Sequence, residues 1–155
     1  MTENRGTKDG LSIREMRRED AQQLAGIESR SFSMPWSEED FLYLVTEGNA
    51  LYLVAEYDGT IAGCAGMRIV CGEGSIDNVV VDEPYRGQGI AQALLGELIR
   101  EGEARGAGDM TLEVRISNAP AIHVYEKFGF VSEGVRPNFY EMPCEDALIL
   151  WRRRC

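Results

Sequence analysis

The chain has 155 residues, 44% of them hydrophobic, which is enough for one domain with a sizeable core. Its 26 acidic residues outnumber the 16 basic ones, and a net charge of −10 opposes binding to the phosphates of nucleic acids. An acidic surface suits a basic partner such as a cationic peptide, although it also favours solubility by itself.

The first elements that we expect are a strand and two helices. Leu11–Met16 has the composition of a strand, and apolar residues at helical spacing indicate a helix over Glu19–Ser31. Ser37 followed by Asp40 resembles a capping box, with Asp in place of the usual Glu. A second helix should therefore begin there and end near Gly48.

A hairpin and a further strand come next. The pair Asp58-Gly59 is a strong signal for a two-residue turn between strands at Leu51–Tyr57 and Thr60–Val70. A fourth strand is expected at Ser75–Val81.

The second half of the chain alternates helices with strands. A long helix with an apolar stripe is expected over Gly89–Arg105, and Asn118 can cap another helix that ends at Gly129. The remaining strands are expected at Met110–Val114, Phe130–Arg136 and Asp146–Trp151. This order predicts an α/β fold, in which a mixed, twisted sheet of about seven strands is flanked by four helices.

Secreted, membrane-spanning and metal-binding proteins are disfavoured. The first ten residues, MTENRGTKDG, lack the apolar segment of a signal peptide, and no apolar run approaches the roughly 20 residues of a membrane span. The four cysteines lack C-x-x-C spacing and His123 is the one histidine, so we expect neither a zinc site nor a His-dependent hydrolase. We expect a cytoplasmic protein with residues 1–10 as a disordered tail and residues 11–155 as a single domain.

The segment Val79–Ala91, VVVDEPYRGQGIA, carries the strongest functional signal. It predicts a strand, a loop with two glycines and the start of the long helix. The first N–H groups of a helix lack intrahelical partners, and glycines allow a ligand to approach the backbone closely. We therefore expect an anion site suited to a pyrophosphate, with an ordinary strand-to-helix turn as the alternative. The segment is neither a P-loop nor the dinucleotide motif G-x-G-x-x-G.

Arg86-x-x-Gly89-x-Ala91 resembles the signature R/Q-x-x-G-x-G/A of the GNAT superfamily of N-acetyltransferases, and the order of elements is similar to that fold over Leu11–Trp151. The resemblance implies acetyl-coenzyme A as the co-substrate, with its pyrophosphate on the loop amides. Backbone groups of the strand before the loop would pair with the pantetheine arm and polarise the thioester carbonyl. The implied coenzyme-binding residues are Val79, Val80, Val81, Arg86, Gly87, Gln88, Gly89, Ile90, Ala91 and Asn118.

Three further blocks resemble the ribosomal-protein-alanine N-acetyltransferases (RimI-like), which acetylate the N-terminal alanine of a small-subunit ribosomal protein. These blocks are Ser31–Ser37, Leu112–Arg115 and Asn118–Phe130. The resemblance implies that the partner is the N-terminus of a basic ribosomal protein. It also implies that Phe32, Pro35 and Trp36 help to form an acceptor groove, although an apolar loop of this kind often serves packing alone.

Glu113 and Tyr125 are the candidate catalytic residues. Leu112 and Val114 face one side of a predicted strand and Glu113 faces the other, which also fits a solvated carboxylate. Tyr125 lies on the apolar face of a predicted helix, where an aromatic residue commonly belongs to the core. The resemblance implies that Glu113 is the general base for the amine and that Tyr125 is the general acid for the departing thiolate.

The expected reaction is direct attack of an amine on the thioester in a ternary complex. An α-amino group has a pKa of about 7.7–8.0, so its deprotonation at neutral pH costs about 1 kcal/mol, whereas lysine costs several. Two alternatives stay open: the same fold acting on a lysine or a small amine, and a non-catalytic module that binds acetyl-coenzyme A. The presence of both an acid and a base candidate argues against the second.

Overall fold

The computed structural model describes residues 10–154, so the expected disordered tail at residues 1–10 falls almost entirely outside the described residues. Within this range seven strands form one mixed sheet in the order β1-β2-β3-β4-β5-β7-β6. The strands are β1 Leu11–Glu15, β2 Ala50–Tyr57, β3 Thr60–Val70, β4 Glu73–Val81, β5 Met110–Arg115, β6 Val131–Tyr140 and β7 Glu145–Arg152. The helices are α1 Ala21–Ser31, α2 Glu38–Thr46, α3 Ile90–Ala104 and α4 Ala119–Lys127, with short 3-10 turns at η1 Arg18–Asp20 and η2 Glu83–Tyr85. The predicted α/β fold is confirmed.

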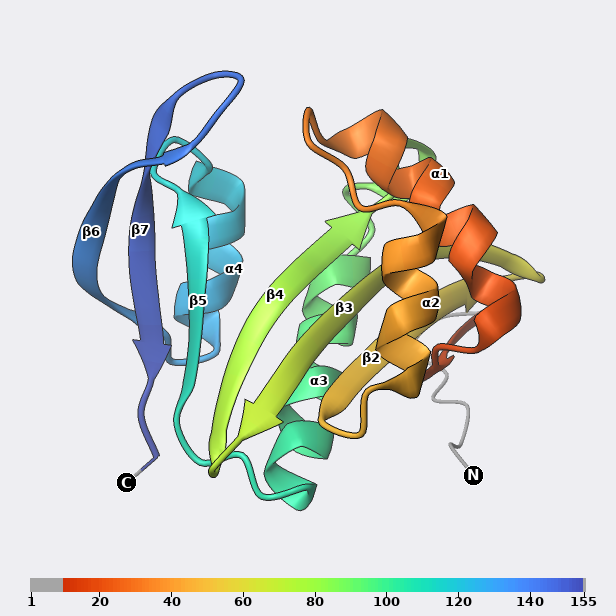
Figure 1. Cartoon of the computed structure of the whole chain (residues 1–155), viewed down its shortest axis with the longest axis horizontal. Coiled ribbons are helices and arrows are strands. Elements are labelled where there is room, and N and C mark those ends of the chain that lie inside the picture. Colours follow the sequence, from red (N-terminus) through yellow and green to blue (C-terminus); the bar gives the residue numbers. More distant parts are fainter. Residues whose placement is uncertain (1–9, 155) are drawn as a thin grey trace.

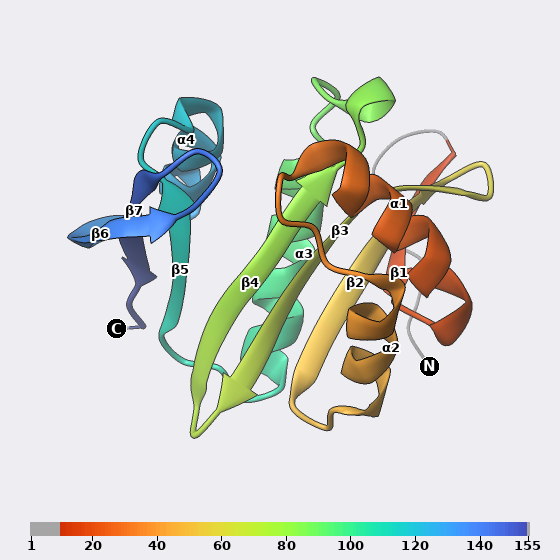
Figure 2. The same cartoon turned by 45° about the horizontal axis from the view of Figure 1, so that its top comes forward.

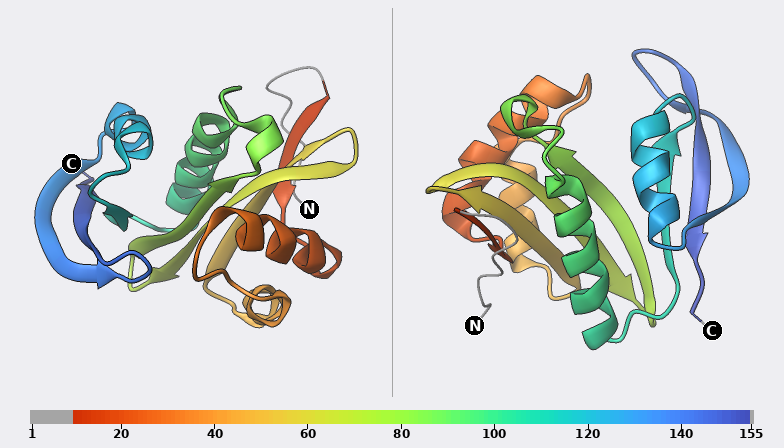
Figure 3. Two further views of the ribbon diagram at one scale, coloured as in Figure 1. Left: turned by 90° about the horizontal axis from the view of Figure 1, so that it is seen from above. Right: turned by 180° about the vertical axis from the view of Figure 1, so that it is seen from behind.

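Two helices cover each face of the sheet. Seen from above, α1 and α2 lie on one face, and α3 and α4 lie on the other (Figure 3). One apolar cluster fills the space beneath α3 and includes Leu94, Leu98 and Met110. A second cluster lies beneath α1 and α2 and includes Leu24 and Phe41. None of the helices in the described part of the chain is long and apolar enough to cross a membrane.

Local signals in the sequence set several element boundaries. The Ser37 hydroxyl accepts from the Asp40 N–H at 3.2 Å and the Asp40 carboxylate accepts from the Ser37 N–H at 2.8 Å, so the expected capping box starts α2. Asp58 and Gly59 have φ angles of 48° and 84°, as a type I′ hairpin turn requires. The predicted end of a strand at Arg136 is wrong, because β6 passes through an irregular register and pairs with β7 again as far as Tyr140.

Strands β4 and β5 separate soon after they begin. Their parallel pairing is limited to Gly74 with Met110 and Ser75 with Thr111. Further along, β4 keeps β3 as its neighbour, and Val79–Val81 pair with Gly63–Ala65. The edge of β4 that faces β5 therefore has no strand partner at Val79–Val81. The two halves of the sheet diverge visibly beyond this point (Figures 1 and 2).

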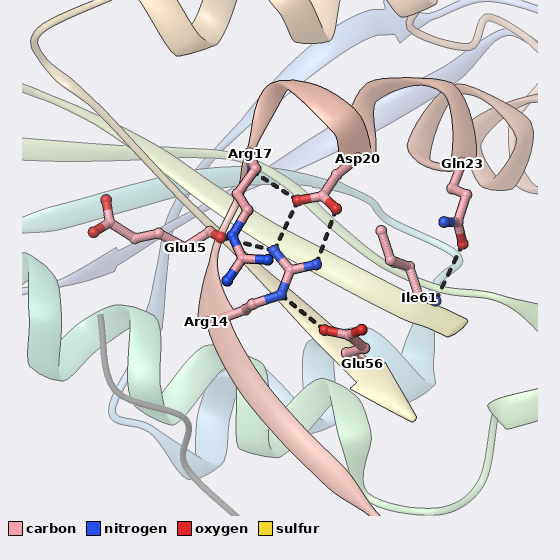
Figure 4. A network of polar contacts seen from close by, with 7 residues as sticks. All are labelled: Arg14, Glu15, Arg17, Asp20, Gln23, Glu56 and Ile61. Carbon is pink, nitrogen blue, oxygen red and sulfur yellow. Dashed lines mark hydrogen bonds and ion pairs between the residues drawn. The ribbon is translucent and has the colours of Figure 1, made fainter. Parts of the chain in front are cut away.

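A buried ion pair fastens the edge strand β1 to the start of α1 (Figure 4). The Arg14 guanidinium donates to both carboxylate oxygens of Asp20, at 2.8 and 2.9 Å, and to Glu56 on β2 at 2.8 Å. Asp20 also accepts from the Arg17 N–H at 2.7 Å. Burial opposes the ionisation of Asp20, but these donors outweigh it and lower the pKa of the carboxyl. This network stabilises the contact between β1, β2 and the start of α1. Its residues line neither of the cavities described below.

Candidate active site

Two cavities open where β4 and β5 separate. The larger cavity has a volume of about 650 Å³ and lies between the α1–α2 loop, β5 and the β6–β7 loop. The smaller cavity, of about 500 Å³, lies between the end of β4, the start of α3, and α4. The residues that line both are Ser31, Phe32, Val79, Asn118 and Tyr125. The two cavities therefore meet at the free edge of β4.

Many of the predicted coenzyme-binding residues line the smaller cavity. Its lining includes these expected residues: Val79, Val80, Val81, Arg86, Ala91 and Asn118. Gly87, Gln88, Gly89 and Ile90 are not among the lining residues. The Ile90 side chain is 1% exposed and belongs to the core beneath α3, so Ile90 can serve a ligand through its backbone alone.

The loop before α3 has a conformation that its glycines permit. Gly87 and Gly89 have φ angles of 78° and 79°, and a Cβ atom at either position would meet no other atom within 4 Å. Backbone conformation, and not crowding by the protein, therefore explains the two glycines. Gly89 is the N-cap residue of α3 and no side chain caps it, so the first N–H groups of the helix suit an anionic ligand.

Arg86 and Asp82 connect this loop to α1. The Arg86 guanidinium donates to the Val81 carbonyl at 2.9 Å and to the Ser31 hydroxyl at 3.3 Å. The Asp82 carboxylate accepts from Arg30 at 2.9 and 3.2 Å, and this hydrogen-bonded guanidinium lowers the pKa of Asp82. A positive charge is thus held at the edge of the smaller cavity, near the N-terminus of α3. The residues present fit a ligand with an extended arm and phosphate groups.

Tyr125 belongs both to the core and to the two cavities. It is 8% exposed, and its ring lies edge-on to Phe130 with 5.9 Å between the ring centroids. Burial, with a smaller contribution from Tyr140, raises the pKa of Tyr125 to about 12. The phenol therefore stays protonated at neutral pH and can donate a proton into the region where the cavities meet.

Asn118 is the N-cap of α4, one of the two roles expected for it. Its side-chain oxygen accepts from the Ala121 N–H at 3.3 Å, with Pro120 in the first turn. Asn118 also lines both cavities, while its contact with a coenzyme stays a prediction.

Glu113 lines the larger cavity but not the smaller one. It lies on β5 between Leu112 and Val114, which are 3% and 6% exposed, as the alternation predicts. Its side chain is 34% exposed, and the carboxylate lies 3.4 Å from the guanidinium of Arg136 on β6. The carboxylate can therefore accept a proton from a group in the larger cavity, and its role as general base stays a prediction.

The α1–α2 loop forms one wall of the larger cavity. Phe32 and Trp36 line this cavity as expected for an acceptor groove, whereas Pro35 is not among its lining residues. The indole of Trp36 also packs against Phe41 and Tyr52, with centroid distances of 5.4 and 5.9 Å. The Trp36 side chain therefore both packs against its aromatic neighbours and lines the larger cavity.

Several lining residues were not predicted from the sequence. Phe139 and Tyr140 at the end of β6 and Met142 in the β6–β7 loop line the larger cavity, and no motif marks this segment. Glu28 lines the same cavity from α1, and here a signal existed. It follows Leu24 by four residues, so a carboxylate lies next to the apolar stripe of the helix.

The chain is similar to known acetyltransferases over most of its length. A family model described as the acetyltransferase (GNAT) family matches residues 21–130. A putative [ribosomal protein bS18]-alanine N-acetyltransferase of Bacillus subtilis (strain 168) is 39% identical over 145 residues, which cover 93% of this chain and 96% of the relative. The [ribosomal protein bS18]-alanine N-acetyltransferase of Escherichia coli (strain K12) is 39% identical over 126 residues, which cover 80% and 84%. The crystal structure of the ribosomal-protein-S18-alanine N-acetyltransferase from Escherichia coli superposes with a TM-score of 0.85 and 34% identity, covering 94% of this chain and 96% of that one.

Proposed function

The chain belongs to the acetyltransferase (GNAT) family, and we propose that it acetylates the N-terminal alanine of the ribosomal protein bS18 in the cytoplasm. It is an acetyl-coenzyme A-dependent N-acetyltransferase. The acceptor is proposed because two relatives that are 39% identical carry this acceptor in their names.

The observation that carries the proposal is the meeting of the two cavities at Val79. Acetyl-coenzyme A, which supplies the activated acetyl thioester, would lie in the smaller cavity. There the unpaired edge of β4 can hydrogen-bond an extended arm, and Arg86 with the start of α3 can hold phosphates. The acceptor N-terminus would enter through the larger cavity. Its amine and the thioester then come together beside Val79 and Tyr125.

Glu113 has the chemistry that the acceptor requires. The α-ammonium group must lose a proton before it can attack, and at neutral pH this costs about 1 kcal/mol because its ordinary pKa is about 7.7–8.0. An ionised carboxylate in the larger cavity can accept that proton, directly or through a water molecule. The same base would face a cost of several kcal/mol for a lysine side chain, which favours an N-terminus as the acceptor.

Tyr125 has the chemistry that the leaving group requires. Its pKa of about 12 keeps the phenol protonated at neutral pH. Since Tyr125 lines the smaller cavity as well as the larger one, its hydroxyl can reach a sulfur at the place where they meet. Tyr125 would protonate the departing thiolate of coenzyme A and so prevent its return attack on the new amide.

The test is acetylation of a panel of synthetic peptides that differ only in their first residues, read by mass spectrometry. The panel contains the bS18 N-terminus, the same peptide with Ser, Met or Glu at its first position, and an Nα-blocked version that carries lysine. The proposal expects the highest kcat/KM for the alanine peptide and acetylation at its α-amine. Preference for the blocked lysine peptide, or coenzyme binding without turnover on any amine, would overturn it.

A further inference from the structure

Glu28 is a buried carboxylate in the larger cavity with no part in the reaction described above. It lies on α1 and is 2% exposed. One carboxylate oxygen accepts from the side-chain amide of Asn78 at 2.7 Å, and the other accepts from the Trp36 N–H at 3.2 Å. Burial raises the pKa of Glu28, and the two donors act against this effect by favouring the ionised form. A carboxylate is costly to bury. Its hydrogen bonds with two cavity-lining residues therefore suggest that it holds them in position.

Asn78 lies on β4 directly before Val79, where the two cavities meet. The register of β4 against β3 changes here: Gly66 pairs with Asn78, but Met67 pairs with Ile76, so Asp77 is an extra residue. This bulge accompanies a turn of the Asn78 side chain toward α1, where it meets Glu28. Asn78 is 9% exposed and lines the larger cavity.

The hydrogen bond to Glu28 fixes which end of the Asn78 amide is free. A carboxylate that already receives the Trp36 N–H is an acceptor, so the NH₂ group of Asn78 must face it. The amide carbonyl oxygen is then the group that remains, and it receives no hydrogen bond from any residue between 10 and 154. An unengaged acceptor therefore lies on a side chain that lines the cavity proposed for the acceptor amine.

We propose that Asn78 binds the α-amine of the acceptor through its side-chain carbonyl oxygen, and that Glu28 is the positioning residue that holds the amide in this orientation. The inference rests on the proposed function and adds a specific contact to it. A neutral carbonyl oxygen accepts a hydrogen bond from the ammonium group and from the neutral amine alike. A carboxylate in its place would favour the ammonium form and oppose the deprotonation that precedes attack.

The first test is Glu28→Gln, a nearly isosteric change. The new side chain can still accept the Trp36 N–H, but it presents NH₂ to the NH₂ of Asn78. The Asn78 amide must then turn over and direct a donor toward the acceptor amine. We expect the KM for an alanine-initiated peptide to rise tenfold or more. The KM for acetyl-coenzyme A should change less than twofold, because neither Glu28 nor Asn78 lines the smaller cavity.

The matched control is Asp20→Asn. Asp20 is also buried, at 5% exposure, and it also joins the start of α1 to the sheet, through Arg14 on β1, but it lines neither cavity. It should lower the melting temperature and leave the peptide KM within twofold of the wild-type value. If Glu28→Gln behaves in the same way, Glu28 is only a structural brace and the inference is overturned.

The second test reverses donor and acceptor in the pair. In the double variant Glu28→Gln/Asn78→Asp, the new amide on α1 donates to one oxygen of the new carboxylate on β4, whose other oxygen can accept from the amine. The peptide KM should recover to within threefold of the wild type, while kcat stays low at neutral pH because a carboxylate favours the ammonium form. A peptide KM that stays as high as in Glu28→Gln would contradict the proposal. Should Glu28→Gln fail to fold, Asn78→Ala serves in its place, with the same tenfold rise expected and an unchanged KM as the refuting result.

The proposed function can fail independently of this inference. A wild-type enzyme that acetylates no peptide N-terminus would remove the proposed function itself. A wild-type enzyme that acetylates the alanine peptide, together with a Glu28→Gln variant of normal peptide KM, would remove the Asn78 contact alone.

Discussion

The guanidinium of Arg136 lies 3.4 Å from the carboxylate of Glu113, and the two residues come from strands that are not neighbours in the sheet. Glu113 is on β5 and Arg136 is on the edge strand β6, with β7 between them. The ion pair crosses one face of the sheet beside the larger cavity, which Glu113 lines and Arg136 does not. The ion pair with Arg136 therefore holds the carboxylate of the candidate base in place, while 34% of the Glu113 side chain stays exposed to an incoming amine.

We expect Glu113→Gln to lower kcat by about 10²–10⁴-fold, the usual contribution of one acid–base group. Coenzyme affinity should hold, because Glu113 does not line the smaller cavity. Steady-state kinetics with the alanine peptide and calorimetry with acetyl-coenzyme A measure the two effects. Glu133→Gln is the control, since Glu133 is an exposed carboxylate on β6 that is paired with Arg153 instead. A fall in kcat below threefold at neutral pH would make Glu113 a surface carboxylate.

Tyr125→Phe should separate the core role of Tyr125 from its catalytic role. The ring and its contact with Phe130 stay, so the melting temperature should hold, while loss of the hydroxyl should lower turnover by about 10²-fold or more. The defect should shrink with an acyl donor whose thiol leaving group is more acidic, because such a group needs less protonation. Tyr57→Phe is the control, because Tyr57 stacks on Tyr85 and lines neither cavity. Wild-type rates in Tyr125→Phe would leave Tyr125 as packing alone.

Gly89→Val should weaken acetyl-coenzyme A binding by roughly 2 kcal/mol or more, because a β-branched residue cannot easily hold the positive φ that presents the start of α3 to a pyrophosphate. Gly106→Val is the matched control. Gly106 follows the other end of α3, has a φ of 97°, and like Gly89 leaves open space where a Cβ would lie. Both variants should lose melting temperature, and calorimetry should find lower coenzyme affinity for the Gly89 variant alone. Equal affinities would remove the anion site from this loop.

Features of the fold that depend on near neighbours could be predicted from the sequence. Ser37 and Asp40 form a capping box within one turn, and Asp58-Gly59 adopts its turn because both residues tolerate positive φ. The loop at Arg86 to Ala91 could be found for the same reason. Its glycines have a local conformational role, and its place between a strand and a helix is visible in the pattern.

The remainder of the candidate site depends on contacts between distant segments. Asn78 and Glu28 are 50 residues apart, and no pattern in either segment predicts the hydrogen bond that joins them. The separation of β4 from β5 after two residue pairs creates both cavities, and it follows from the packing of whole layers. The wall formed by Phe139 and Met142 depends on where the end of β6 and the β6–β7 loop lie relative to β5. The periodicity of the sequence can assign such residues to helices or strands, but it does not predict how those helices and strands pack together.

Asp20→Asn should destabilise the fold by about 3 kcal/mol, because Arg14 is 6% exposed and would keep a buried charge with Glu56 as its remaining charged partner. Urea unfolding followed by circular dichroism at pH 7 gives this difference in the free energy of unfolding. Glu133→Gln should leave the midpoint nearly unchanged, since the ion pair of Glu133 with Arg153 is exposed. Kinetic constants should hold in both variants, because Asp20 lines neither cavity.

The pH dependence of the same pair has a definite sign. The folded-state pKa of Asp20 is lowered below its ordinary value of 3.8, because the donors from Arg14 and Arg17 outweigh the effect of burial. The stability that ionised Asp20 contributes is therefore fully present above that ordinary value and is lost as the pH falls through the lower, folded-state pKa. The difference between the wild type and Asp20→Asn should be constant from pH 8 to about pH 5 and should narrow below about pH 4. A difference that widens in acid would mean that Asp20 is held protonated in the folded protein and that the pair with Arg14 is not ionic.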